Sequence, residues 1–212
     1  MKFPPEVDIK LAGWQLFWAE LKVKGNGAEL TQEREALPSR LRTILKGLPI
    51  AEHPTVRSVR SLFRNAGCDP TRYRPSSEAL ARRISRGEPF PSIHPAVDIN
   101  NIWSVELMIP CCVLNPSKLK GALTLRRGQS GEMMDSMRGP FNLEGKPTLV
   151  DSNGAFGSPI TDSERVAVKT AKGTFWLLAY LPQNVVSPEL ANEHLNSLIK
   201  RVGSAEILAT SS

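Results

Sequence analysis

The stretch AVDINNIWSVELMIP, residues 96–110, separates a helix-rich half of the chain from a half rich in strand signals. Its apolar residues fit a buried helix, and Pro110 is expected to end that helix. The residues expected to line the buried helix are Val97, Trp103, Val105, Leu107 and Met108. A buried helix is therefore predicted where the two halves meet.

Beyond Pro110, short runs rich in β-prone residues alternate with Gly, Asn, Asp and Pro, which are typical turn residues. The runs are ALTLRR (122–127), PTLVD (147–151), RVAVKTA (165–171) and GTFWLLAYL (173–181). They predict a mostly antiparallel sheet or a pair of sheets. An amphipathic helix is expected over 187–202, and the last residues, ILATSS, are expected to fray.

Upstream of residue 96, the pattern is mainly helical. The segments 28–47, 53–67 and 75–87 read as helices, and Pro38 is expected to break or kink the first. Before them, residues 6–27 favour a pair of strands ending in a turn at Gly25-Asn26-Gly27. The chain is therefore predicted to be one α+β domain, 1–212, with helices packed against mostly antiparallel sheets.

Composition and charge are those of an ordinary globular protein. Hydrophobic residues make up 41% of the 212 residues, which fits one domain that folds unaided. The formal net charge of +6 permits an anionic partner without proving one. Cys111 and Cys112 are adjacent, so free thiols in a reducing compartment are expected. No run is apolar enough for a membrane span or signal peptide, so a cytoplasmic location and no membrane partner are expected.

Most of the excess charge lies between His53 and Phe90. Arginine predominates there, and its planar guanidinium suits bidentate contact with phosphates. The residues expected to contact RNA are Arg57, Arg60, Arg64, Arg82, Arg83 and Arg86. The structural alternative is that Glu78 pairs with Arg82 one turn on, while arginines at helix ends interact with the helix dipole.

Motifs of the common enzyme classes are absent. The chain has no GxSxG, HExxH, P-loop or strand-linked GxGxxG sequence, so neither a metal nor a nucleotide cofactor is expected. The three histidines form no recognisable triad, and a surface or structural role is favoured for each. They are His53, His94 and His194.

Polar residues flank the predicted central helix. Asp98, Asn100 and Asn101 lie near its start, and Cys111 and Cys112 follow its end. An acid and two amides beside an apolar face can orient an amino acid, its ester and a water molecule. They can equally cap the helix, because Asp and Asn are good N-cap residues. Composition leaves both interpretations open.

Two stretches resemble a known family. RYRPSSEALARRISRG (72–87), followed by AVDINNIWSVELMIPCCVLNPSKLKG (96–121), is similar to freestanding members of the B3/B4 family. The second stretch also resembles the phenylalanyl-tRNA synthetase β-subunit signature that runs, without a gap, from Val-Asp-x-Thr-Asn to Pro-x-His-Ala-Phe-Asp. The likeness covers about residues 50–182, with a strand and helix extension at 1–49 and the helix 187–202 beyond it.

The resemblance implies an α+β editing domain that hydrolyses the ester of a wrongly attached amino acid, chiefly tyrosine, at the tRNA end. The family's Thr-Asn pair falls on Asn100 and Asn101, which are implied to be catalytic by positioning the ester and a water. The family's histidine falls on Cys112. The residues implied to line the substrate pocket are Asp98, Cys112, Asp151, Asn153, Gly154, Ala155 and Ser158.

The chain departs from the family pattern at three positions. Cys112 replaces the histidine, Asn115 replaces the following aspartate, and Leu178 falls at the expected acidic position. A positioned water is favoured over a Cys112 thiolate, because no histidine lies beside the cysteine in sequence. We therefore expect a trans-editing aminoacyl-tRNA deacylase that binds the aminoacylated acceptor end of tRNA. The alternatives are a non-catalytic module that binds tRNA or a free amino acid, and a DNA-binding protein.

Overall fold

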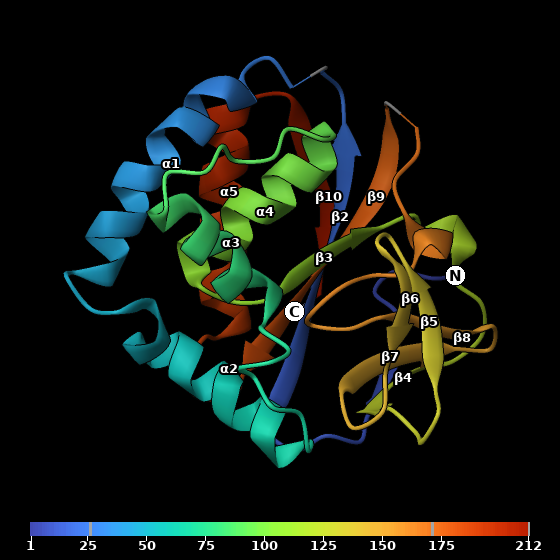
Figure 1. Ribbon diagram of the computed structural model, residues 1–212. Helices are drawn as coiled ribbons and strands as arrows, with labels where there is room; N and C mark the ends of the chain where they lie inside the picture. The colour runs from blue at the N-terminus through green and yellow to red at the C-terminus, as the bar shows by residue number, and fades with distance from the viewer. Residues whose placement is uncertain (26, 171, 212) are drawn as a thin grey trace.

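A computed structural model describes residues 1–25, 27–170 and 172–211. Asn26 of the predicted turn, Ala171 of the predicted strand 165–171 and Ser212 of the predicted frayed end lie outside these residues. Figure 1 shows helices on one side of a central sheet and a smaller β-layer on the other side. The fold is α+β with mostly antiparallel sheets, so this prediction is confirmed.

The helices lie mainly in the first half of the chain. They are α1 (Leu30–Leu45), α2 (Pro54–Asn65), α3 (Ser76–Ser85), α4 (Pro95–Leu107) and α5 (Pro188–Val202), with 3₁₀ turns at Ile50–Glu52, Pro116–Lys118 and Glu164–Val166. Pro38 lies inside α1 and does not end it.

Strands fill most of the second half and begin and end the chain. They are β1 (Val7–Ile9), β2 (Trp14–Val23), β3 (Cys111–Leu114), β4 (Leu123–Arg127), β5 (Met133–Ser136), β6 (Gly139–Asn142), β7 (Pro147–Asp151), β8 (Gly154–Gly157), β9 (Gly173–Pro182) and β10 (Ala205–Thr210).

The central sheet has the order β10-β2-β9-β3, with neighbouring strands antiparallel. A second sheet has the order β1-β4-β7-β8, in which β1 runs parallel to β4, and β5 pairs with β6. The first two strands therefore form where the sequence predicted them, but they belong to different sheets.

The two faces of the central sheet contribute to different hydrophobic clusters. Along β9, Leu177 and Ala179 pack in the helix-side cluster, whereas Trp176, Leu178 and Tyr180 pack in a cluster shared with the second sheet. Strands buried on both faces read as nearly continuous apolar runs, as GTFWLLAYL does. This alternation places neighbouring side chains of one strand in different environments.

Two local predictions are wrong. Residues 165–171 form no strand over the described part, because the Ser163 hydroxyl caps a 3₁₀ turn by accepting a hydrogen bond from the Arg165 amide (3.2 Å). Over the described residues 207–211 the predicted fraying is also wrong, because β10 pairs with β2 from Ala205 to Thr210 and the Ser211 amide donates to the Trp18 carbonyl. Tertiary pairing overrides the weak local signal of this short segment.

Within the described residues, no helix combines the length and the apolar character that crossing a membrane requires.

Candidate functional site

The start of α4 is capped by His94. The imidazole accepts a hydrogen bond from the Ala96 amide (3.1 Å), which satisfies one donor of the first turn. Asp98, Asn100 and Asn101 lie within the helix rather than at its N-cap position. The alternative that they cap this helix is therefore wrong, and their side chains are available for other contacts.

Asn100 points from α4 to the outer strand of the central sheet. Its Nδ2 donates to the Cys111 carbonyl (3.5 Å) and approaches Asn101 Oδ1 (3.4 Å). The side chain is buried, and Asn100 Oδ1 has no hydrogen-bond partner among the described residues. An enclosed amide oxygen without a donor is costly, so Asn100 retains the capacity to accept a hydrogen bond from water or a ligand.

Asp98 is enclosed and already paired. Its Oδ2 lies 2.6 Å from Arg34 Nη1, and its Oδ1 accepts a hydrogen bond from the Ile93 amide (3.0 Å). Asp98 also lines a cavity of about 290 Å³ together with Arg34 and His94. These contacts hold the segment before α4 in place, so Asp98 has a structural role that does not depend on a ligand.

β3 places the two adjacent cysteines on opposite faces of the sheet. Cys111 belongs to the helix-side cluster, whereas Cys112 belongs to the other cluster and pairs in register with Leu178 of β9. Burial raises the pKa of the Cys112 thiol well above its usual value, and the nearby Asp162 carboxyl acts in the same direction. Cys112 is therefore a thiol, not a thiolate, at neutral pH.

Cys112, Asp162 and Tyr180 form a polar cluster beneath the sheet. Burial raises the pKa of Asp162 to about 8, and the Cys112 thiol interacts with this carboxyl. Burial also raises the pKa of the Tyr180 hydroxyl well above its usual value. Asp162 Oδ1 and Tyr180 Oη are enclosed without a nitrogen or oxygen partner among the described residues. The cluster therefore has unused hydrogen-bonding capacity.

The loop from Gly157 to Asp162 encloses this cluster. A Cβ added to Gly157 would lie 3.1 Å from Asp162 Oδ1 and 3.5 Å from Tyr180 Oη, so glycine at this position lets both side chains approach the backbone closely. Ser158 is buried, and its Oγ is also unpartnered among the described residues. The loop is anchored at the start of α3, where the Ser76 amide donates to the Pro159 carbonyl (2.9 Å).

The remaining predicted pocket residues lie at the other end of the β7–β8 hairpin. The Asp151 carboxylate binds the Arg165 guanidinium (3.0 Å) and the Lys120 amide (2.9 Å). Asn153 and Gly154 are exposed at the turn, and Ala155 is half-buried. Gly154 lies three residues from Gly157, about 10 Å along an extended strand. Of the predicted 151–158 segment, the structure therefore brings Ser158 closest to the polar cluster.

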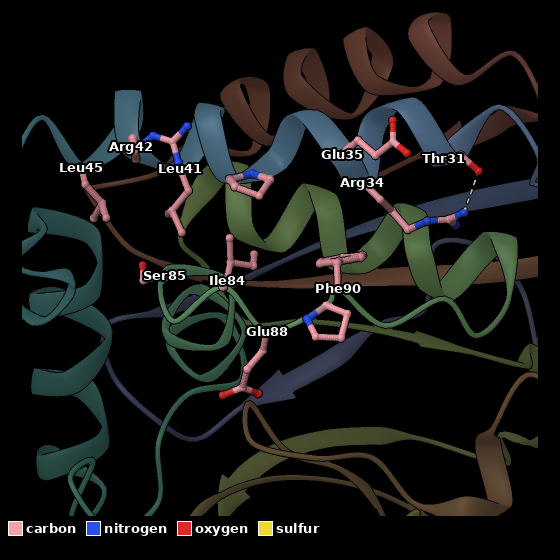
Figure 2. A pocket seen from close by; sticks show the side chains of 13 residues that line it. Thr31, Arg34, Glu35, Leu41, Arg42, Leu45, Ile84, Ser85, Glu88 and Phe90 are labelled. Atoms are coloured by element: carbon pink, nitrogen blue, oxygen red, sulfur yellow. Dashed lines mark hydrogen bonds between the residues drawn. The ribbon is translucent and has the colours of Figure 1, made fainter.

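A larger groove lies elsewhere, between α1 and the end of α3 (Figure 2). Its volume is about 740 Å³, and it combines apolar side chains such as Ile84 and Phe90 with charged ones. Arg34 is engaged by Asp98, and Glu88 by Arg86. These two charges are satisfied within the chain, whereas Glu35 and Arg42 also line the groove.

Comparison with known families shows which protein family the chain belongs to. The family model of the B3/4 domain matches residues 58–196. This chain belongs to the B3/4 domain family. The match includes α4, β3, the Gly157–Asp162 loop and β9, which together build the site.

One solved structure similar to this B3/4 domain is the crystal structure of an N-terminal fragment of the phenylalanyl-tRNA synthetase beta-subunit from Pyrococcus horikoshii. The TM-score is 0.46 and the sequence identity is 13%. The comparison covers 97% of this chain and 51% of that chain, so the B3/4 domain spans about half of that fragment's length. No curated protein matches the chain.

Asp162 and Tyr180 of the B3/4 domain were not predicted as site residues. Asp162 follows a Gly-Ser-Pro loop, and Tyr180 lies within an apolar strand, so neither stands in a recognisable motif. The available signal is weak: a tyrosine and an aspartate in otherwise apolar surroundings must find partners once they are buried. Their approach to Cys112 depends on strand register, which the sequence does not specify.

The arginines of the B3/4 domain divide into paired and unpaired groups. Arg60 and Arg82 both bind the fully buried Glu78, which confirms the predicted Glu78–Arg82 pair. Arg83 and Arg86 bind Glu88. By contrast, Arg57 and Arg64 on α2 are exposed, and no acidic residue of the described chain forms an ion pair with either. These two have the freest guanidinium groups among the arginines predicted to contact RNA.

Proposed function

We propose that this B3/4 domain hydrolyses the ester of mischarged aminoacyl-tRNA in trans, with the region around β3 as the pocket for the aminoacyl end. One observation carries the proposal: enclosed polar atoms without partners gather on both sides of β3 and on the adjoining loop. They are Asn100 Oδ1, Ser158 Oγ, Asp162 Oδ1 and Tyr180 Oη. Family membership and the resemblance of residues 96–121 to the synthetase signature support the same assignment.

In the proposed reaction, water is the nucleophile. Asn100 accepts a hydrogen bond from the water and thereby orients its oxygen toward the ester carbonyl. The water oxygen bonds to the carbonyl carbon, the bond to the ribose oxygen breaks, and the water proton passes to that oxygen. An amino acid and deacylated tRNA result. An activated ester needs chiefly positioning and stabilisation of the developing charge, which neutral side chains can supply.

The test is hydrolysis of a panel of mischarged tRNAs by the purified full chain. At least one amino acid is expected to be released faster than in buffer. Asn100→Ala should lower kcat by about tenfold or more while tRNA affinity changes little, because the lost interaction acts mainly in the transition state. Asn196→Ala is the matched control, because Asn196 is exposed on α5 and bonds only within its own helix.

A second candidate function is a non-catalytic module that binds tRNA or a free amino acid. The observation that favours it is the pairing of protonated Cys112 with Leu178, where the family pattern has a histidine and an acidic residue. A complete panel that is bound but never hydrolysed would reject the deacylase and support this module.

A further inference from the structure

Exposed arginines without an acidic partner among the described residues lie in the segments that meet where α2 ends against the second sheet. We call them the junction arginines. They are Arg64 in the last turn of α2, Arg72 and Arg74 in the loop between α2 and α3, and Arg127 at the end of β4. The neighbouring Arg126 differs, because both of its Nη atoms donate to the Glu132 carboxylate (2.8 Å each). The junction arginines therefore keep their charge available to an external anion.

Two glycines hold the Arg127 guanidinium in place. A Cβ added to Gly67 would lie 2.7 Å from Arg127 Nη2 and 2.9 Å from its Cζ, and one added to Gly145 would lie 3.6 Å from Nη2. Both glycines have positive φ, at 88° and 72°, which other residues seldom adopt. The guanidinium therefore packs against the backbone of two turns. A group held in this way can bind two oxygens of one phosphate with little further loss of side-chain entropy.

Tyr73 restrains a second junction arginine. The Arg72 Cζ lies 5.2 Å from the centroid of the Tyr73 ring, and the Lys146 Nζ lies 3.9 Å from the same centroid. Lys146 is buried, and no carboxylate in the described part of the chain forms an ion pair with it. Its ammonium group donates to the Glu144 carbonyl (3.2 Å). Two cations on one ring make this side of the loop strongly positive.

The carboxylates of the same segments already accept hydrogen bonds from backbone amides. Asp69 accepts from the Thr71 amide (2.8 Å), and Glu144 accepts from the Gly131 amide (3.3 Å). The junction arginines and Lys146 outnumber these two carboxylates. The surface therefore carries an excess of positive charge, which suits a polyanion.

We propose that the junction arginines bind the phosphate backbone of tRNA, an inference whose choice of partner rests on the function proposed above. Planar guanidinium groups match phosphate oxygens, and several neighbouring unpaired cations suit successive phosphates better than one small anion. The loop that carries Arg72 and Arg74 leads directly into α3, where the Ser76 amide donates to the Pro159 carbonyl (2.9 Å). The surface therefore ends beside the loop that encloses the candidate pocket, and it extends the RNA contacts predicted for α2 onto the second sheet.

The experiment measures binding of deacylated bulk tRNA to the full chain by filter binding at several salt concentrations. Arg72→Ala and Arg127→Ala should each reduce the slope of log affinity against log salt by about 1 and weaken binding about tenfold at low salt. Arg127→Lys keeps the charge but lacks the planar fork, so it should keep the slope while binding weakens. Lys200→Ala is the charge-matched control, because Lys200 is exposed on α5, across the central sheet from β4. It should change affinity less than twofold.

Unfolding midpoints show whether each variant is folded. An unchanged slope in folded Arg127→Ala, an equal loss in Lys200→Ala, or wild-type affinity in Arg127→Lys overturns the proposal. Polyglutamate that binds more tightly than tRNA, in a manner that depends on Arg127, also overturns it and makes the partner an acidic protein.

Hydrolysis assays separate this inference from the proposed function. Arg127-dependent tRNA binding without hydrolysis of any mischarged tRNA rejects the deacylase alone. Where hydrolysis is observed, Arg72→Ala and Arg127→Ala should raise KM and leave kcat unchanged, because backbone contacts are equal in the ground state and the transition state. Hydrolysis with unchanged KM in both variants rejects the RNA surface alone.

Discussion

At the residue scale, Cys112 shows how burial limits chemistry. A thiol enclosed among apolar side chains, with a carboxyl and a phenol beside it, has little tendency to ionise. The sulfur can therefore shape the pocket and donate a weak hydrogen bond, but it is a poor nucleophile. Substitution of Cys112 therefore tests directly whether this cysteine is a reactive group that takes the place of the family's histidine.

Cys112→Ser should retain kcat within about threefold on any tRNA that the wild type deacylates, because a buried hydroxyl keeps the approximate size and the donor. Single-turnover hydrolysis under identical conditions measures the effect. A loss of activity in the folded variant, together with a trapped acyl-enzyme in the wild type, would instead establish thiolate catalysis.

Asp162 should make the free protein less stable as the pH rises. The folded chain holds this carboxyl protonated up to about pH 8, whereas an ordinary aspartate ionises near 3.8. Between these values the folded state binds more protons than the unfolded state, so the free energy of unfolding falls with increasing pH and changes no further above about 8.

Urea unfolding from pH 5 to 8 measures this contribution as the difference between the wild type and Asp162→Asn. The free energy of unfolding should fall more steeply with pH in the wild type than in Asp162→Asn. The variant should therefore become more stable relative to the wild type as the pH approaches 8. Parallel profiles would show that Asp162 ionises normally in the folded chain.

At the element scale, the residues of α2 divide into a packed side and an exposed side. Val59 and Phe63 pack into the core, Arg60 binds Glu78, and Arg57 and Arg64 are exposed. Helical periodicity alone predicts that the arginines share a side, but it does not show which of them the rest of the fold uses. Only the ion pair between Arg60 of α2 and Glu78 of α3 reveals that Arg60 is structural.

The double variant Arg57→Ala with Arg64→Ala should weaken tRNA binding and reduce the slope of log affinity against log salt by about 2, one unit for each lost phosphate contact. Filter binding at several salt concentrations checks this, with the unfolding midpoint unchanged. An unaltered slope would remove α2 from the RNA surface.

Arg60→Ala is the matched comparison. It leaves the fully buried Glu78 with Arg82 as its remaining ionic partner, so the free energy of unfolding should fall by on the order of 2 kcal/mol. Urea unfolding at neutral pH gives the value. A stability equal to that of the wild type would mean that Arg82 alone satisfies Glu78.

At the scale of the whole molecule, strong local patterns were predictable and long-range pairing was not. The apolar run 173–181 predicts β9, and the signals at 75–87 predict α3. β10 was missed because its edge pairing with β2 joins residues almost two hundred positions apart. The candidate site is similar: the resemblance pointed to Asn100, Cys112 and Ser158, whereas Asp162 and Tyr180 became visible only through register and burial.

Deletion of residues 205–212 tests the role of the last strand. It should lower the free energy of unfolding by about 2–4 kcal/mol, because ladder hydrogen bonds are lost, and it should promote self-association through the exposed edge of β2. Urea unfolding and size-exclusion chromatography report the two effects. Leu208→Ser, at an exposed position of the same strand, is the control and should change neither.

The alternation along β9 also has a consequence for how this domain can diversify. Trp176, Leu178 and Tyr180 border the cluster that contains the candidate pocket, whereas the residues between them pack against the helices. Substitutions at these even-numbered positions should therefore alter the cluster shared with the second sheet and the candidate pocket beside it, whereas substitutions at the odd-numbered positions should alter packing against the helices. Because both faces of β9 are buried, a change of recognition through this strand must also preserve the packing of one hydrophobic cluster.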